Sequence, residues 1–166
     1  MFQLRYQSYY YSTSQALPIL EELPEVAQVA FAFCRDWLAG QETFIQQTSG
    51  STGAPKLQIL SRTQMEASAA ATGAFFGTTT PGLLLCCLNP SYIAGKMMIV
   101  RAIVGGFNLH YTEPKGEALL NLDPDLDFIA VVPLQLESVF KSGNFQALSR
   151  VKQMIVGGAA VSQNLI

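Results

Sequence analysis

The stretch from residue 83 to residue 111 reads LLLCCLNPSYIAGKMMIVRAIVGGFNLHY and decides the fold. Residues 83–88 are apolar without alternation, as expected of a strand that is covered on both faces. Residues 91–106 follow as a predicted helix, and the pair Gly105-Gly106 suits the end of a helix. Residues 107–111 then form a second strand. A strand, a helix and a strand in this order predict a parallel pair joined by a helical crossover.

The rest of the chain continues the same alternation. Apolar residues recur at helical spacing from Pro24 to a cap at Gly40, and Ser61 with Gln64 forms a capping-box pair for a helix up to residue 76. Residues 1–22 have no clear period and are predicted to hold an edge strand followed by a loop, and strands at 43–47 and 56–60 are predicted to form a hairpin. The remaining elements are a buried strand at 128–132, a short helix at 134–140 and a strand at 151–158. The pattern predicts an α/β domain with a mostly parallel sheet flanked by helices.

Composition excludes several classes of protein. The chain has 166 residues, of which 49% are hydrophobic and 13% charged, so it is an ordered globular chain. Its net charge of −2 and the absence of a basic run give no reason to expect nucleic acid as a partner. No apolar run approaches the roughly 18 residues of a membrane span, and no leader is evident, which predicts a soluble, cytoplasmic protein. Cys34, Cys86 and Cys87 are predicted to be buried and reduced, with the adjacent pair on opposite faces of a strand.

Between the two hairpin strands, residues 47–56 read QTSGSTGAPK. Glycines at 50 and 53 allow successive backbone N–H groups to converge on an anion, the hydroxyl residues add donors, and Lys56 adds a positive charge. The segment is not a Walker A loop, because the lysine follows a proline and does not open a helix. Composition alone also fits a flexible turn rich in serine and glycine.

The order of these residues resembles the phosphate-binding signature T-S-G-S/T-T-G-x-P-K of the adenylate-forming superfamily, which contains acyl-CoA synthetases, luciferases and peptide-synthetase adenylation domains. The match covers Thr48, Ser49, Gly50, Ser51, Thr52, Gly53, Pro55 and Lys56. The resemblance implies that this loop binds the phosphates of ATP while a carboxylate attacks the α-phosphate. It also implies a catalytic role for Lys56, which would neutralise charge in the transition state.

Two later segments resemble the same superfamily in the same order. In NPSYIAGK, at residues 89–96, Gly95 fits the turn P-L-x-H-x-x-G, and Tyr92 stands where relatives carry a histidine that lines the acyl pocket. The resemblance implies a substrate pocket with Tyr92 and Gly95, although Tyr92 could instead simply pack. In VGGAAVSQNL, at residues 156–165, Gly157, Gly158 and Ala159 match a loop that contacts the adenine and the acyl group.

The short region before the loop, with FCRDWLAGQETF at residues 33–44, is similar to the o-succinylbenzoate–CoA ligases of menaquinone synthesis. The expected substrates are therefore a small carboxylic acid, ATP with Mg²⁺, and CoA. Leu57 replaces a glycine that is common after the lysine and indicates a divergent branch. Another aryl- or fatty-acyl-CoA synthetase, or an amino-acid-adenylating domain, stays open as an alternative.

The resemblance covers residues 31–166, and the superfamily's magnesium-binding glutamate, ribose-binding aspartate and C-terminal domain with the catalytic lysine would follow Ile166. We therefore expect residues 1–166 to be a single, truncated N-terminal ATP-binding domain that is inactive in adenylation by itself. No metal-ligand cluster is evident within the chain. A non-enzymatic nucleotide-binding or interaction module is the alternative of another class, and apolar surface left by the early end would favour association, including a homo-oligomer.

Overall fold

The computed structural model describes residues 2–12, 20–48, 56–78, 82–120, 122 and 125–161. Its centre is a six-stranded sheet in the order β2-β1-β6-β5-β7-β8, in which every pair except β1 with β2 is parallel. The strands are β1 (Gln3–Tyr6), β2 (Tyr9–Ser12), β5 (Leu83–Cys86), β6 (Asn108–Tyr111), β7 (Phe128–Val131) and β8 (Met154–Val156). The predicted α/β architecture with a mostly parallel sheet is confirmed.

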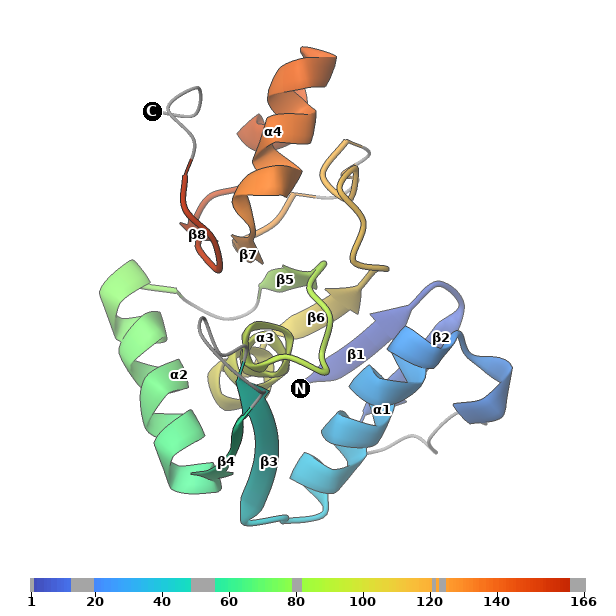
Figure 1. The fold of residues 1–166 in the computed structure, drawn as a ribbon, viewed down its shortest axis with the longest axis vertical. Coiled ribbons are helices and arrows are strands. Elements are labelled where there is room, and N and C mark those ends of the chain that lie inside the picture. Colours follow the sequence, from blue (N-terminus) through green and yellow to red (C-terminus); the bar gives the residue numbers. More distant parts are fainter. Residues whose placement is uncertain are drawn as a thin grey trace.

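Helices cover both faces of the sheet (Figure 1). One face packs against α1 (Glu25–Leu38), α2 (Arg62–Phe76) and α3 (Ile93–Gly105), and the other against α4 (Pro133–Ser142) and the short α5 (Gln146–Ser149); a 3₁₀ turn, η1 (Leu20–Glu22), precedes α1. Successive residues of β5, and Cys87 directly after it, therefore enter different cores. Leu84 and Cys86 belong to the core under α1–α3, and Leu85 and Cys87 to the core under α4.

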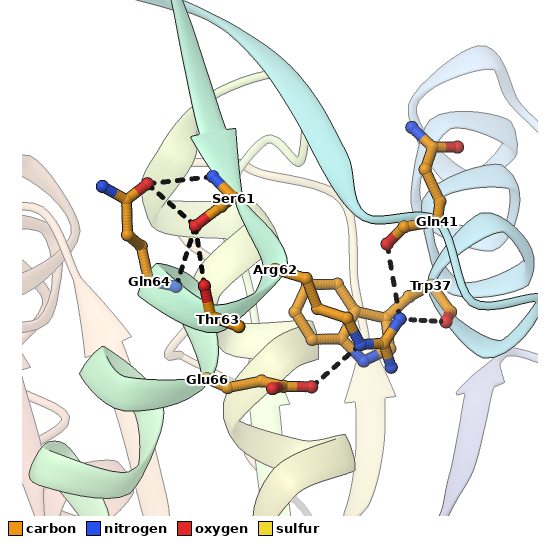
Figure 2. A network of polar contacts seen from close by, with 7 residues as sticks. All are labelled: Trp37, Gln41, Ser61, Arg62, Thr63, Gln64 and Glu66. Atoms are coloured by element: carbon orange, nitrogen blue, oxygen red, sulfur yellow. Dashed lines mark hydrogen bonds and ion pairs between the residues drawn. The ribbon is translucent and has the colours of Figure 1, made fainter.

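A separate two-stranded antiparallel sheet consists of β3 (Thr43–Thr48) and β4 (Lys56–Ser61). The end of this hairpin at Thr43 and Ser61 is fixed between α1 and α2 (Figure 2). The Arg62 guanidinium lies 4.4 Å from the centre of the Trp37 ring, donates to the Trp37 carbonyl at 2.8 Å and pairs with Glu66 at 2.9 Å. The predicted capping box is present, because the backbone amide of Gln64 donates to the Ser61 hydroxyl and the side-chain oxygen of Gln64 accepts from the backbone amide of Ser61.

Three details differ from the sequence-based expectation. The N-terminal segment forms two strands joined by a tight turn at Gln7 (φ 52°), so β2 is the edge strand and β1 lies inside the sheet. The strand predicted at 151–158 is only three residues long and ends before its glycines. The α1 cap is Ala39, with Gly40 (φ 89°) one residue beyond it. The predicted burial and free state of Cys34, Cys86 and Cys87 are confirmed.

Within the described part of the chain, no helix is both long enough and apolar enough to cross a membrane.

Candidate functional site at the carboxyl edge of the sheet

In open α/β sheets, ligands bind beyond the carboxyl ends of the parallel strands. A cavity of about 510 Å³ lies at this edge of the sheet. Its walls come from residues 87–89 after β5, residues 92–94 at the start of α3, residues 114–116 after β6, residues 132, 134 and 135 around the start of α4, and Gly158 after β8. Segments that are distant in the sequence therefore meet in one hollow, which we call the edge cavity.

Tyr92 lies on the rim of the edge cavity. It is the N-cap residue of α3, and its side chain is 56% exposed. The turn that carries it is closed by two hydrogen bonds: the Tyr92 amide donates to the Asn89 carbonyl at 3.1 Å, and the Ser91 amide donates to the Asn89 side chain at 2.8 Å. These bonds fix the backbone of the turn, and the exposed Tyr92 is accessible to a ligand.

Gly95 does not line the edge cavity, and its place is behind the Tyr92 turn. A Cβ atom built on Gly95 would lie 2.5 Å from the Asn89 carbonyl oxygen and 2.7 Å from the Pro90 nitrogen. Only a residue without a side chain lets the first turn of α3 approach the Asn89–Pro90 backbone this closely. The structure therefore gives Gly95 a positioning role: it allows the turn that presents Tyr92 to pack against α3.

One of the two glycines after β8, Gly158, lines the same cavity. The Gly157 amide donates to the Val131 carbonyl at 3.1 Å, which extends the pairing of β7 with β8. Gly158 has a φ of 85°, a conformation that favours glycine, and it lines the cavity. Ala159 is exposed and is not among the lining residues. Of the residues predicted from the sequence, Tyr92 and Gly158 are brought together.

Gln135 was missed by sequence reasoning, and it joins three walls of the edge cavity. Its side chain is buried, and its Nε2 donates to the carbonyls of Cys87 at 3.0 Å and Lys115 at 3.2 Å. Its Oε1 accepts from the Val132 amide at 3.1 Å. The sequence signals only its capping role, because glutamine at the third position of a helix that begins with proline is a capping residue.

Lys115 is the one charged residue among the described residues that line the cavity. Its Nζ lies 2.6 Å from Oε2 of Glu113, and Glu113 Oε1 accepts from the Tyr6 hydroxyl at 3.2 Å. The hydrogen bonds from Lys115 and Tyr6, together with the Lys115 charge, lower the pKa of Glu113. The hydrogen bond with Glu113 and its charge raise the pKa of Lys115. Both groups are therefore charged at neutral pH.

The predicted phosphate-loop residues Ser49, Gly50, Ser51, Thr52 and Gly53 lie outside the described residues. For Thr48 and Lys56 the structure describes the backbone, where they pair across the hairpin at the two ends of that segment. The neighbouring part of β3 is tied to the start of α3. Gln46 Nε2 donates to the Ser91 carbonyl at 3.1 Å, and Lys96 Nζ donates to the Ile45 carbonyl at 3.1 Å. The hairpin thus leads toward the turn that carries Tyr92.

A second cavity of about 500 Å³ lies between α2 and α3 and is bordered by Leu84, Phe107 and Phe128 of the sheet region. Arg101 of α3 lines it and donates to the Thr72 hydroxyl at 3.3 Å, and its guanidinium lies 5.9 Å from the centre of the Phe128 ring. No carboxylate of the described residues pairs with Arg101. Burial lowers its pKa, but an arginine stays protonated at neutral pH. Sequence analysis did not single out Arg101, and its one indication there is an arginine within a mostly apolar helix.

Among the described residues, no three His, Cys, Asp or Glu side chains lie close enough together to hold a metal ion.

Comparison with known proteins identifies the family of the chain. Residues 13–166 match the family described as AMP-binding enzyme, so the chain belongs to the AMP-binding enzymes. It is 25% identical over 150 residues to a 2-succinylbenzoate–CoA ligase of Listeria innocua, and this match covers 88% of the chain and 32% of that protein. The chain thus spans about a third of the length of the curated relatives that it matches.

Solved structures give the same result for the fold. An acyl-CoA synthetase (AMP-forming)/AMP-acid ligase II-like protein from Dyadobacter fermentans is 36% identical, with a TM-score of 0.77 over 91% of this chain and 45% of that one. The o-succinylbenzoate CoA synthetase MenE from Bacillus subtilis, solved with its acyl-adenylate intermediate, is 19% identical. It has a TM-score of 0.62 over 70% of this chain and 31% of that one. The second likeness shows the shared fold.

Proposed function

We propose that this chain is the ATP-binding part of an AMP-forming acid–CoA ligase. The observation that carries the proposal is the convergence of the Tyr92 turn, the Gly158 turn and the hairpin that bears the TSGSTGAPK segment at one edge of the sheet. In the proposed reaction, a carboxylate oxygen attacks the α-phosphorus of ATP, and the bond to pyrophosphate breaks. The thiolate of CoA then attacks the acyl carbonyl and AMP leaves. Such a ligase would act in the cytoplasm, where ATP and CoA are supplied.

The residues between Thr48 and Lys56 would hold the ATP phosphates. Backbone amides near glycines and hydroxyl groups are suitable donors for phosphate oxygens, and Lys56, the first residue of β4, would add a positive charge. Preorganised donors act mainly on charge that develops in the transition state, so Lys56 would affect the rate more than ground-state binding. Gly157 and Ala159, beside Gly158, would border the nucleotide. Bound Mg²⁺ would neutralise phosphate charge.

We propose o-succinylbenzoate as the acid, and the support for it is that the curated relatives that this chain matches are 2-succinylbenzoate–CoA ligases. Tyr92, Leu88 and Leu134 give the edge cavity apolar walls, which suit the aromatic ring of this acid.

The test is substrate-dependent pyrophosphate release by the polypeptide of the complete reading frame. o-Succinylbenzoate should give a higher kcat/KM than benzoate, a medium-chain fatty acid or amino acids. A parent protein that prefers a fatty acid or an amino acid would reject the proposed substrate, and a protein that releases no pyrophosphate with any acid would reject the ligase.

A further inference from the structure

The edge cavity is separate from the cavity between α2 and α3, and Lys115 lines the first whereas Arg101 lines the second. The proposed reaction gives Lys115 no role. Apart from Lys115, the described residues that line the edge cavity are uncharged, and Tyr92, Leu88 and Leu134 give it apolar walls. A ligand that fills it therefore has an apolar or aromatic part, and any anionic group on it meets one cation.

Lys115 is held at both ends, unlike a typical surface lysine. Its carbonyl accepts from the buried Gln135 side chain, which fixes the backbone of residue 115 against β5 and α4. Its ammonium pairs with Glu113, and Glu113 accepts from the hydroxyl of Tyr6, which is buried in β1. Contacts with β1, the end of β5 and α4 thus hold Lys115 beside the cavity.

Glu113 occupies only part of the donor capacity of Lys115. A lysine ammonium has three N–H donors, and the side chain of Lys115 is 67% exposed. An exposed ion pair contributes little to stability and is exchanged easily, so an incoming anion can bind to the ammonium or displace Glu113.

We propose that Lys115 is the anion-recognition residue of the edge cavity, and that the cavity binds a ligand with an apolar arm and a carboxylate or phosphate group. The ligand class rests on the proposed function, which supplies two sources of this chemistry: the carboxylic acid and the phosphorylated thiol CoA. Glu113 acts as a competitor for Lys115, which weakens the binding of anions that do not also fill the apolar cavity.

Binding is measured by isothermal titration calorimetry on the 166-residue chain with four probes. CoA is compared with pantetheine, which lacks the phosphates, and o-succinylbenzoate with 1-phenylbutan-1-one, which lacks both carboxylates. Lys115→Gln should lower the affinity for one charged probe about three- to tenfold and leave its partner probe unchanged. Lys115→Arg should restore most of the affinity. Whichever pair responds identifies the source of the anion.

Two further variants sharpen the test. Lys152→Gln is the matched control, because Lys152 is also an exposed lysine, paired with Asp127 at 2.7 Å, and it does not line the cavity. It should leave all four affinities unchanged. Glu113→Gln removes the competitor and should raise the affinity for the responding probe about two- to fivefold.

Equal effects of Lys115→Gln and Lys152→Gln, equal losses for charged and uncharged probes, or no binding of any probe would each overturn the proposal. The proposed function is tested separately. Acid-dependent pyrophosphate release requires ATP and the Lys56 side chain, whereas the calorimetry contains no ATP and does not depend on Lys56. If the protein releases pyrophosphate but Lys115→Gln does not change any binding affinity, only the role of Lys115 is rejected. If Lys115→Gln lowers an affinity but no pyrophosphate is released, only the ligase is rejected.

Discussion

Gly95→Ala tests whether the approach of α3 to the Asn89–Pro90 backbone determines the position of Tyr92. The added methyl would lie 2.5 Å from the Asn89 carbonyl oxygen, 2.6 Å from its carbon and 2.7 Å from the Pro90 nitrogen. All three atoms belong to the backbone, so no side chain can rotate to make room. The turn must move away from the helix by about 1 Å to restore ordinary contact distances of about 3.5 Å.

The expected cost follows from two opposing effects. Forced repacking of a tight interior contact costs about 1–3 kcal/mol, and the rigid backbone neighbours favour the upper end of that range. Alanine in place of glycine within a helix returns about 1 kcal/mol. The expected net loss in the free energy of unfolding is therefore about 2 kcal/mol, which corresponds to a decrease in Tm of about 4–8 °C for a chain of this size.

The assay is urea unfolding of parent and variant, with Gly73→Ala as the matched control. Gly73 is inside α2, and a methyl there would meet only the Thr78 hydroxyl, at 3.4 Å. This control should gain about 0.5–1 kcal/mol from helix propensity. If Gly95→Ala is as stable as the parent, or gains stability as Gly73→Ala does, the close-approach argument for Gly95 is wrong.

The remaining predictions concern the cap, the thiols and the acid stability of the chain. Ser61→Ala removes the N-cap of α2 and should cost about 1 kcal/mol in urea unfolding, whereas Ser68→Ala on the exposed side of the same helix should change it by less than about 0.5 kcal/mol. Burial raises the pKa of the three cysteine thiols, to about 11 for Cys87 and about 12 for Cys34 and Cys86. Iodoacetamide at pH 8 should therefore label them only after unfolding, and fast labelling of the folded chain would refute their burial. Burial raises the pKa of Asp127, but the hydrogen bonds from Lys152 and the Leu83 amide outweigh it and hold the pKa below its ordinary value of 3.8. The charged form thus stabilises the fold above that pH, and the contribution is lost as the pH falls through the folded pKa. Asp127→Asn should flatten the stability curve below pH 4, and an unchanged curve would contradict the role of this carboxylate.

Local sequence patterns were sufficient for most of the fold. The unbroken apolar run at residues 83–88 predicted a strand covered on both faces, and Cys86 and Cys87 do enter different cores. The pair Ser61 and Gln64 predicted the start of α2, because a capping box is made by residues close together in the sequence. The strand order was not predictable in this way, because β1 pairs with β6 across about a hundred residues.

The site was predictable only in part, for the same reason. Motif order identified Tyr92 and Gly158, and the structure brings them to one cavity. The contacts of Gln135 with Cys87 and Lys115 join segments whose proximity depends on sheet topology, so no local pattern could indicate them. Gly95 was predicted as a pocket residue, whereas its contacts with the Asn89 backbone arise from three-dimensional packing.

The measurement that tests the central claim most directly is acid-dependent exchange of pyrophosphate into ATP by the polypeptide of the complete reading frame, compared between parent and Lys56→Ala. The account predicts exchange that requires o-succinylbenzoate, and a decrease of about 100-fold or more when Lys56 is replaced, since a preorganised cation acts on transition-state charge. Exchange by Lys56→Ala at a rate close to the parent's would contradict the account.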